Sequence, residues 1–238
     1  MKKNISLWRV LLVLVVLVAV VSTGIHYRYY LWPPSEEQLE ALRVDLHSPS
    51  SFVRCETVIV LGKMGPRAIP VLTEALQDEE PQIREWAVRS LGQLGAESMS
   101  ALEQAAKDQD RGVRQAALGA LGTLGSDAQA ALPTIRTALA DSDRNIRDSA
   151  VCALGGIGPE TIADLRVALK DQDAGIRCRA AMELGKMGPP AVEAVPAIKT
   201  ACNDPDRKVR QFAEGALQQI QPLTVLHRTV NWVGRVFP

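Results

Sequence analysis

The sequence predicts an all-α protein, a solenoid of about six helix pairs that follows one transmembrane helix. Three observations lead to this prediction. A valine or isoleucine followed by arginine recurs six times, with arginine spacings of 30, 30, 33, 30 and 33 residues. Residues that start and end helices recur at the same phase, and a long uncharged apolar segment lies near the N-terminus. Internal repeats of this length indicate supersecondary units that bury their apolar faces against one another.

Residues 1–34 predict a signal-anchor helix and a short juxtamembrane linker. Residues 10–25 carry no charge, and residues 8–27 form a stretch long enough to cross a bilayer. Lys2, Lys3 and Arg9 precede most of this stretch, which favours a cytoplasmic N-terminus and an extracytoplasmic, periplasmic repeat domain. A cleaved signal peptide is the alternative, although no Ala-x-Ala motif follows the apolar core. We therefore expect a single-pass membrane protein.

One helix of each repeat, here called the Gly-ended helix, is defined by its distance from the repeated arginine. Residues one before and three, seven and ten after the arginine are apolar or small, the spacing of one helix face. Ser, Glu or Asp stands four residues before it and is expected to cap the helix. In five copies glycine stands eleven residues after it, where a left-handed helix end favours glycine.

A shorter connecting helix follows each Gly-ended helix. Pro70, Pro133 and Pro196 fall in the connecting helices of alternate repeats and predict that these helices start late or kink. We expect the 33-residue repeats to hold their three additional residues in this helix.

Glycines inside the Gly-ended helices, such as Gly92, lower helix stability by about 1 kcal/mol relative to alanine. They therefore predict close packing of a neighbouring backbone. With an opening helix at 36–47, residues 35–221 form six antiparallel pairs.

The pattern Asp-x-Asp-x-x-Val-Arg-x-x-Ala-x-x-x-Leu-Gly-x-Leu-Gly, nearly complete at residues 108–125, resembles the short bacterial HEAT-like repeats of phycobilisome-lyase-type proteins. This resemblance covers residues 35–221 and implies a right-handed α-solenoid with degenerate capping repeats at its ends. It also implies that the repeated Asp and Arg residues are structural and link adjacent repeats. These residues are Arg54, Arg84, Arg114, Arg147, Arg177 and Arg210, with Asp78, Asp108, Asp141, Asp171 and Asp204.

Composition and motifs exclude several classes of function. Residues 35–221 carry 21 Lys and Arg against 27 Asp and Glu, so the cationic excess that nucleic acid requires is missing. Paired acids in Asp-x-Asp could hold a divalent ion, but each copy starts a helix at the same phase, which favours capping. The four cysteines lack metal-ligand spacing. No nucleophile elbow, phosphate loop or dinucleotide motif occurs, and we expect no metal, no cofactor and no small-molecule substrate.

The expected function is a non-catalytic, membrane-tethered scaffold or adaptor that binds another protein. By resemblance, the Gly-ended helices line the concave side, and positions 1, 2, 5 and 9 after each arginine should face outward. Tryptophan and arginine are enriched in binding hot spots, although Trp86 could instead pack in the core. Candidate contact residues are Glu85, Trp86, Arg89, Cys152, Arg179 and Met182.

Two further expectations concern the enzymatic branch of the family and the C-terminus. The family also contains lyases, so the alternative function is bilin attachment to phycobiliproteins, by this chain or by an enzyme of which it is a subunit. Residues 222–238 place apolar residues at helical spacing. This segment is interpreted as a helix that caps the stack or as a basic amphipathic helix on a membrane surface.

Overall fold

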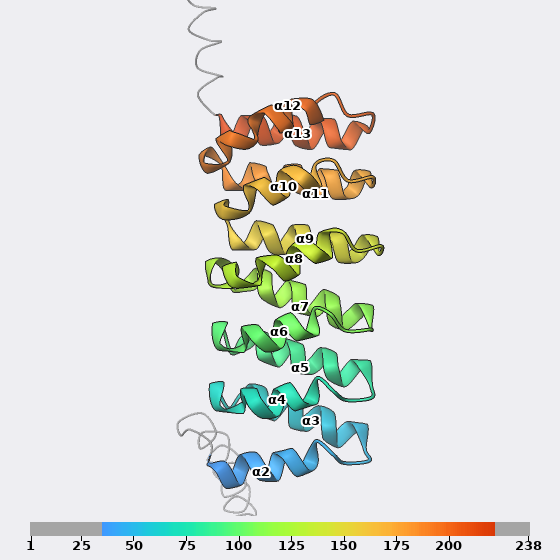
Figure 1. Ribbon diagram of the computed structural model, residues 1–238, viewed down its shortest axis with the longest axis vertical. Helices are drawn as coiled ribbons and strands as arrows, with labels where there is room; N and C mark the ends of the chain where they lie inside the picture. The colour runs from blue at the N-terminus through green and yellow to red at the C-terminus, as the bar shows by residue number, and fades with distance from the viewer. Residues whose placement is uncertain (1–34, 222–238) are drawn as a thin grey trace, which may run out of the picture.

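The computed structural model describes residues 35–221, which form helices joined by short loops with no strand among them. Figure 1 shows the helix pairs stacked in chain order, from α2 at one end to α12 and α13 at the other. The predicted all-helical repeat solenoid is confirmed. The helices are α2 (Glu36–Asp45), α3 (Ser51–Gly62), α4 (Ile69–Ala75), α5 (Pro81–Gln93), α6 (Met99–Ala105), α7 (Arg111–Thr123), α8 (Leu132–Leu139), α9 (Arg144–Ile157), α10 (Ile162–Ala168), α11 (Ala174–Met187), α12 (Val195–Ala201) and α13 (Arg207–Ile220).

The odd-numbered helices from α3 onward are the Gly-ended helices, and a 3₁₀ segment follows each of the first five. The glycines that end α3, α5, α7, α9 and α11 all have positive φ angles, between 60° and 118°, as predicted for left-handed helix ends. The 3₁₀ segments are η1 (Pro66–Ala68), η2 (Ala96–Ser98), η3 (Gly125–Ala131), η4 (Pro159–Thr161) and η5 (Pro189–Ala194).

The predicted late start of the proline-containing connecting helices is confirmed for α8 and α12, which begin seven residues after the helix-ending glycine. Helix α4 begins four residues after it, as α6 and α10 do without proline. Pro70, Pro133 and Pro196 each occupy the first turn of their helix. Proline is suited to that turn, because an amide hydrogen there has no partner inside the helix. Segments η3 and η5 contain seven and six residues, whereas the other three contain three. The prediction that the connecting helix holds the additional residues is therefore wrong, since they lie in the 3₁₀ segments η3 and η5.

Aspartates cap four of the Gly-ended helices. The side chain of Asp110 accepts hydrogen bonds from the amides of Gly112 and Val113 at 2.7 and 3.2 Å. Asp173 and Asp206 cap α11 and α13 in the same way, and Asp143 caps α9 through the amide of Asn145. Ser50 and Glu80 occupy the corresponding positions before α3 and α5, but their side chains make no capping hydrogen bond. The predicted caps are thus confirmed for the four aspartates alone.

The core runs the length of the stack between the two layers of helices. The small residues three positions after the arginines are buried in all six Gly-ended helices, as are most of the leucines seven positions after them. Sequence analysis missed a further core position, four residues after the arginine. Its buried members are Val58, Val88, Leu118, Val151 and Ala181, and in α13 the exposed Glu214 takes this place. Polar replacement there fits an end repeat with no further described pair beside it.

Glycines inside the Gly-ended helices allow consecutive helices to approach closely. A Cβ atom added at Gly92 would lie 2.9 Å from the Cβ of Ala120, and one at Gly122 would lie 2.8 Å from the Cα of Ala153. Gly62, Gly155 and Gly185 have equally close neighbours on the next helix. The predicted close approach of a neighbouring backbone is confirmed at Gly122 and Gly185, whereas the nearest atoms at Gly62, Gly92 and Gly155 belong to side chains of the next helix.

None of the helices within residues 35–221 is long and apolar enough to cross a bilayer. The predicted membrane span at 8–27 and the predicted tail helix at 222–238 both lie outside the described residues.

Candidate binding groove

Arginines and aspartates of consecutive repeats meet along one edge of the stack, and we call each such pair a rung. Arg147 donates through Nε and Nη2 to the carboxylate of Asp171 at 2.8 and 3.2 Å, and its Nη1 donates to the backbone carbonyl of Asp141 at 3.0 Å. One side chain therefore joins the loop before its own helix to the loop of the next repeat. The same two-pronged contact forms in the rungs Arg54–Asp78, Arg84–Asp108 and Arg177–Asp204.

These rungs are shielded from water. The side chains of Arg54 and Asp78 are only 7% and 8% exposed. Hydrogen bonds from Arg177 lower the pKa of Asp204 below its usual value, against the opposing effect of burial. Bidentate, charge-assisted pairs of this kind are the stronger hydrogen bonds in proteins.

The rung at Arg114 is incomplete. The Nε of Arg114 lies 3.7 Å from Asp141 and is buried without a hydrogen-bond partner, while Nη1 still donates to the carbonyls of Asp108 and Gln109. A local difference accompanies this gap. Helix α8 ends at Leu139, so one residue separates it from the aspartate, whereas two residues separate the other connecting helices from theirs. Arg210 donates to the carbonyls of Asp204 and Pro205, and no further rung follows it among the described residues.

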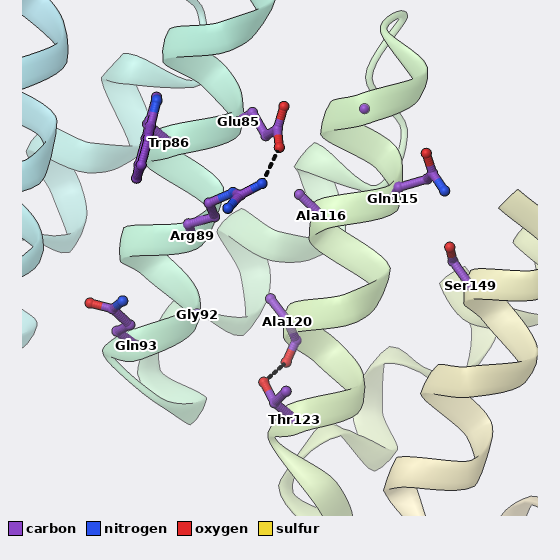
Figure 2. Close-up of a pocket in the computed structure, with 11 residues that line it drawn as sticks. Glu85, Trp86, Arg89, Gly92, Gln93, Gln115, Ala116, Ala120, Thr123 and Ser149 are labelled. Atoms are coloured by element: carbon purple, nitrogen blue, oxygen red, sulfur yellow. Dashed lines mark hydrogen bonds and ion pairs between the residues drawn. The ribbon is translucent and has the colours of Figure 1, made fainter. Parts of the chain in front are cut away.

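A groove of about 760 Å³ lies over the exposed faces of α5 and α7 and reaches Ser149 on α9. Figure 2 shows Trp86, Arg89 and Gln93 along α5, with Ala116 and Ala120 on α7 beside them. The close approach of Gly92 to Ala120 forms the base of the groove between the two helices. The repeat geometry thus leaves a depression that is walled by longer side chains and floored by small ones.

The wall on α5 holds three of the predicted contact residues. The guanidinium carbon of Arg89 lies 5.5 Å from the centre of the Trp86 ring, and Nη2 of Arg89 lies 2.6 Å from Glu85. Trp86 is 43% exposed, so it is a surface residue and not part of the buried core. Because the charges of Glu85 and Arg89 compensate each other, this wall presents an aromatic ring with little net charge.

Two amide side chains in the groove, those of Gln93 and Gln115, have no hydrogen-bond partner within the described residues. Gln93 is exposed near the end of α5, and Gln115 is partly exposed near the start of α7. Each amide offers two donor hydrogens and an acceptor oxygen. Their repeat positions gave the signal that they face outward, but only the structure shows that they share one groove.

The other predicted contact residues, Cys152, Arg179 and Met182, lie on α9 and α11 and do not line this groove. All three are partly exposed. The Nε of Arg179 donates to Asp148 at 3.3 Å, and burial raises the pKa of the Cys152 thiol, which therefore stays protonated at neutral pH. The six candidates form two separate groups.

Glu183 on α11 is a residue that sequence analysis missed. It is a buried acid packed against Gly155, where the other helices place serine or alanine, and Lys186 donates to it at 2.9 Å. Its departure from the small residues at this repeat position was the signal in the sequence. Because Lys186 compensates its charge, we interpret Glu183 and Lys186 as a local structural ion pair.

The comparisons with known proteins agree with this architecture. A family model described as HEAT repeats matches residues 39–121, 99–174 and 162–227, most of the chain. The chain belongs to the HEAT-repeat family. A search of curated proteins finds no match to this HEAT-repeat chain.

Solved structures similar to the HEAT-repeat chain include a designed armadillo repeat protein, an engineered protein and a lyase complex. A designed armadillo repeat protein in complex with the peptide (KR)4 is 18% identical, with 78% of this chain and all of that chain covered and a TM-score of 0.52. An engineered protein is 22% identical, with 77% and 98% covered and a TM-score of 0.52. The complex of CpcE and CpcF of phycocyanin lyase from Nostoc sp. PCC7120 is 24% identical, with 80% and 79% covered and a TM-score of 0.49.

Proposed function

We propose that this HEAT-repeat chain is a non-catalytic, membrane-tethered scaffold that binds another protein at the groove over α5 and α7. The observation that carries the proposal is a half-exposed tryptophan in the wall of a depression of about 760 Å³. Large exposed aromatic side chains beside an arginine are typical of the residues that dominate protein interfaces. The designed armadillo protein with the peptide (KR)4 supports the proposal, because it is a helical repeat array with a bound polypeptide.

The proposed tether is the apolar stretch at 8–27, with the N-terminus in the cytoplasm and a right-handed, periplasmic solenoid whose Gly-ended helices face its concave side. The basic residues before this stretch support the orientation. Such a tether confines the groove to a layer next to the membrane. A partner in that layer meets the groove at a raised effective concentration, so a modest intrinsic affinity suffices.

Photo-crosslinking from inside the groove tests this function. A photoreactive amino acid replaces Gln115 in the full chain, in cells that make the protein, and a second variant carries it at Val167 of α10, which is 65% exposed. We expect a protein adduct of one defined mass from position 115 and none from position 167. The absence of a protein adduct, or equal adducts from both positions, contradicts the proposal. A tetrapyrrole adduct favours the bilin-lyase alternative.

Comparison of Trp86 with a matched aromatic residue shows whether the Trp86 side chain itself contributes to partner binding. Phe212 occupies the same repeat position on α13 and is also 43% exposed. We expect Trp86→Ala to abolish most of the adduct and to weaken partner binding by about 2 kcal/mol or more, while Phe212→Ala leaves both unchanged. Neither change should lower the melting temperature strongly, because neither residue lies in the core. A large melting loss in Trp86→Ala with intact binding assigns the ring a structural role.

A further inference from the structure

The two ends of the described array lie at the same edge of the stack. Helix α2 begins at Glu36 and α13 ends at Ile220. Figure 1 shows both of these helix ends at the edge formed by the 3₁₀ segments, opposite the loops that carry the rungs. The chain from the apolar stretch at 8–27 therefore joins the array at the same edge at which residues 222–238 begin.

The end of the stack at α13 is polar where a further helix would pack. The position four residues after the arginine is buried and apolar in the other five Gly-ended helices, but in α13 it is the exposed Glu214. The position eight residues after the arginine is a glycine against the next helix in those five, but in α13 it is the exposed Gln218. An apolar segment packed here would cover Glu214, and burial of a carboxylate is unfavourable.

The C-terminal segment (residues 222–238) has the composition of a segment that binds a lipid surface. Its apolar residues recur at three- and four-residue intervals, at Leu223, Leu226, Val230, Val233 and Phe237. It also holds Trp232, two arginines and no acid, a combination that suits the interface of a bilayer with anionic headgroups. Because the end of the stack is polar, the bilayer is the better apolar environment for these residues.

We propose, resting on the membrane tether of the proposed function, that the C-terminal segment binds the bilayer surface and lays the array lengthwise along it, with the edge of 3₁₀ segments toward the lipid. Residues 28–35 span at most about 29 Å between the apolar stretch and α2, and the C-terminal segment follows α13 directly. Both ends of the array therefore lie near the bilayer. The rung edge is farther from the lipid by about one helix length, about 20 Å for thirteen residues.

The edge of 3₁₀ segments does not itself hold the array on the lipid. Its exposed charged residues have both signs, with Lys63, Arg67 and Lys186 against Glu97, Asp127, Glu160 and Glu193. The two ends of the array thus provide the attachment. In this orientation the groove over α5 and α7 opens parallel to the plane of the bilayer, so a partner at the membrane surface reaches it from the side.

Energy transfer to acceptor dyes on lipid headgroups measures this orientation. The full chain is placed in nanodiscs of phosphatidylcholine and phosphatidylglycerol. A donor dye is attached through a ketone-bearing amino acid at one exposed position at a time, at Glu97 or Glu193 on the 3₁₀ edge or at Gln109 or Gln172 on the rung edge. We expect equally high transfer from Glu97 and Glu193, and equally lower transfer from Gln109 and Gln172.

An upright array gives a different result. Glu97 and Glu193 are three repeats apart, about 24–30 Å along the stack, so transfer that falls from Glu97 to Glu193 overturns the proposal. Equal transfer from both edges also overturns it. A chain that fails to remain in the nanodisc contradicts the tether of the proposed function as well. Crosslinking from position 115 tests partner binding independently of the orientation.

Substitutions in the C-terminal segment test whether it provides the second attachment. Val230→Asp combined with Val233→Asp should lower transfer from Glu193 at least about twofold, because charged residues weaken insertion at the interface, and should leave transfer from Glu97 unchanged. Val230→Leu combined with Val233→Leu is the matched control, because it keeps both positions apolar, and should change neither value. If the aspartates leave transfer from Glu193 unchanged, or strongly lower the melting temperature of the repeat array, the segment caps the stack and the proposal is wrong.

Discussion

At the scale of single residues, each complete rung concentrates several interactions on one arginine. Arg147 joins the carboxylate of Asp171 and the carbonyl of Asp141 while its side chain is only 7% exposed. A bidentate pair that is out of water is difficult to replace, because removal of the cation leaves the carboxylate buried and uncompensated. The arginines of the four complete rungs therefore link one repeat to the next.

Two arginines that look alike in sequence should differ in their contribution to stability. Arg147→Ala should lower the free energy of unfolding by about 3–5 kcal/mol, since it strands Asp171. Arg114→Ala should lower it by about 1–2 kcal/mol, because the Nε of Arg114 makes no hydrogen bond to Asp141 and the change removes mainly bonds to carbonyls. Urea denaturation of both variants measures the difference. Equal losses would show that the Arg114 rung is complete in solution.

The Arg177–Asp204 rung also makes stability depend on acidity. The pKa of Asp204 is lowered in the folded state by hydrogen bonds from Arg177, relative to about 3.9 in an unfolded chain. Stability from this carboxylate is therefore fully present above about pH 4 and is lost as pH falls through the folded pKa. We expect the melting temperature of the natural chain to exceed that of Asp204→Asn at pH 7, and the gap to shrink below about pH 4. A gap that stays constant down to about pH 2.5 would contradict this assignment.

At the scale of helices, glycine occurs in two different environments on the same element. Gly122 faces the backbone of α9, whereas Gly119, one turn earlier, faces open space. Gly122→Ala should cost about 1–3 kcal/mol of folding free energy, because a methyl group 2.8 Å from the Cα of Ala153 forces the helices apart. Gly119→Ala should raise stability by about 0.5–1 kcal/mol through better helix propensity. Thermal melts of the two variants should move in opposite directions.

Most of the helices and their ends could be predicted because the same helix-starting and helix-ending residues recur in every repeat. The recurrence of an aspartate, an arginine and a terminal glycine at constant distances fixes the helix phase, and that phase places Glu85, Trp86 and Arg89 on one exposed face. The sequence does not show how neighbouring faces meet. The shared groove of Gln93 and Gln115, and the separation of Arg179 from it, depend on how the helices lie side by side.

The incomplete rung could not be predicted for a related reason. Arg114 and Arg177 each stand 27 residues before their aspartates, yet only Arg177 forms the close pair. The difference coincides with the end of α8, which lies one residue closer to Asp141 than the other connecting helices lie to their aspartates. Helix ends differ by a single residue for reasons of local packing, and repeat spacing carries no information about them.

At the scale of the whole molecule, the proposed topology makes a direct prediction for residues 8–27. The full chain should remain in the membrane pellet after carbonate washing, and protease added to spheroplasts should digest the repeat domain, since the basic residues favour a cytoplasmic N-terminus. Replacement of Lys2, Lys3 and Arg9 by neutral residues should weaken this orientation. Protection of the repeats in spheroplasts would indicate the opposite topology, and a shortened soluble form would indicate cleavage of the N-terminal segment.

The rungs and the glycine contacts have a consequence for how such a chain changes through gene duplication. Each of these contacts joins one repeat to the next. Within the described residues a glycine lies at all five junctions between Gly-ended helices, and a complete arginine–aspartate rung lies at four of them. An in-frame duplication of one 30-residue unit therefore brings its own arginine, aspartate and glycine and completes two compatible junctions. The length of the exposed face can grow by a helix pair in one genetic event, while the groove over α5 and α7 keeps its own residues.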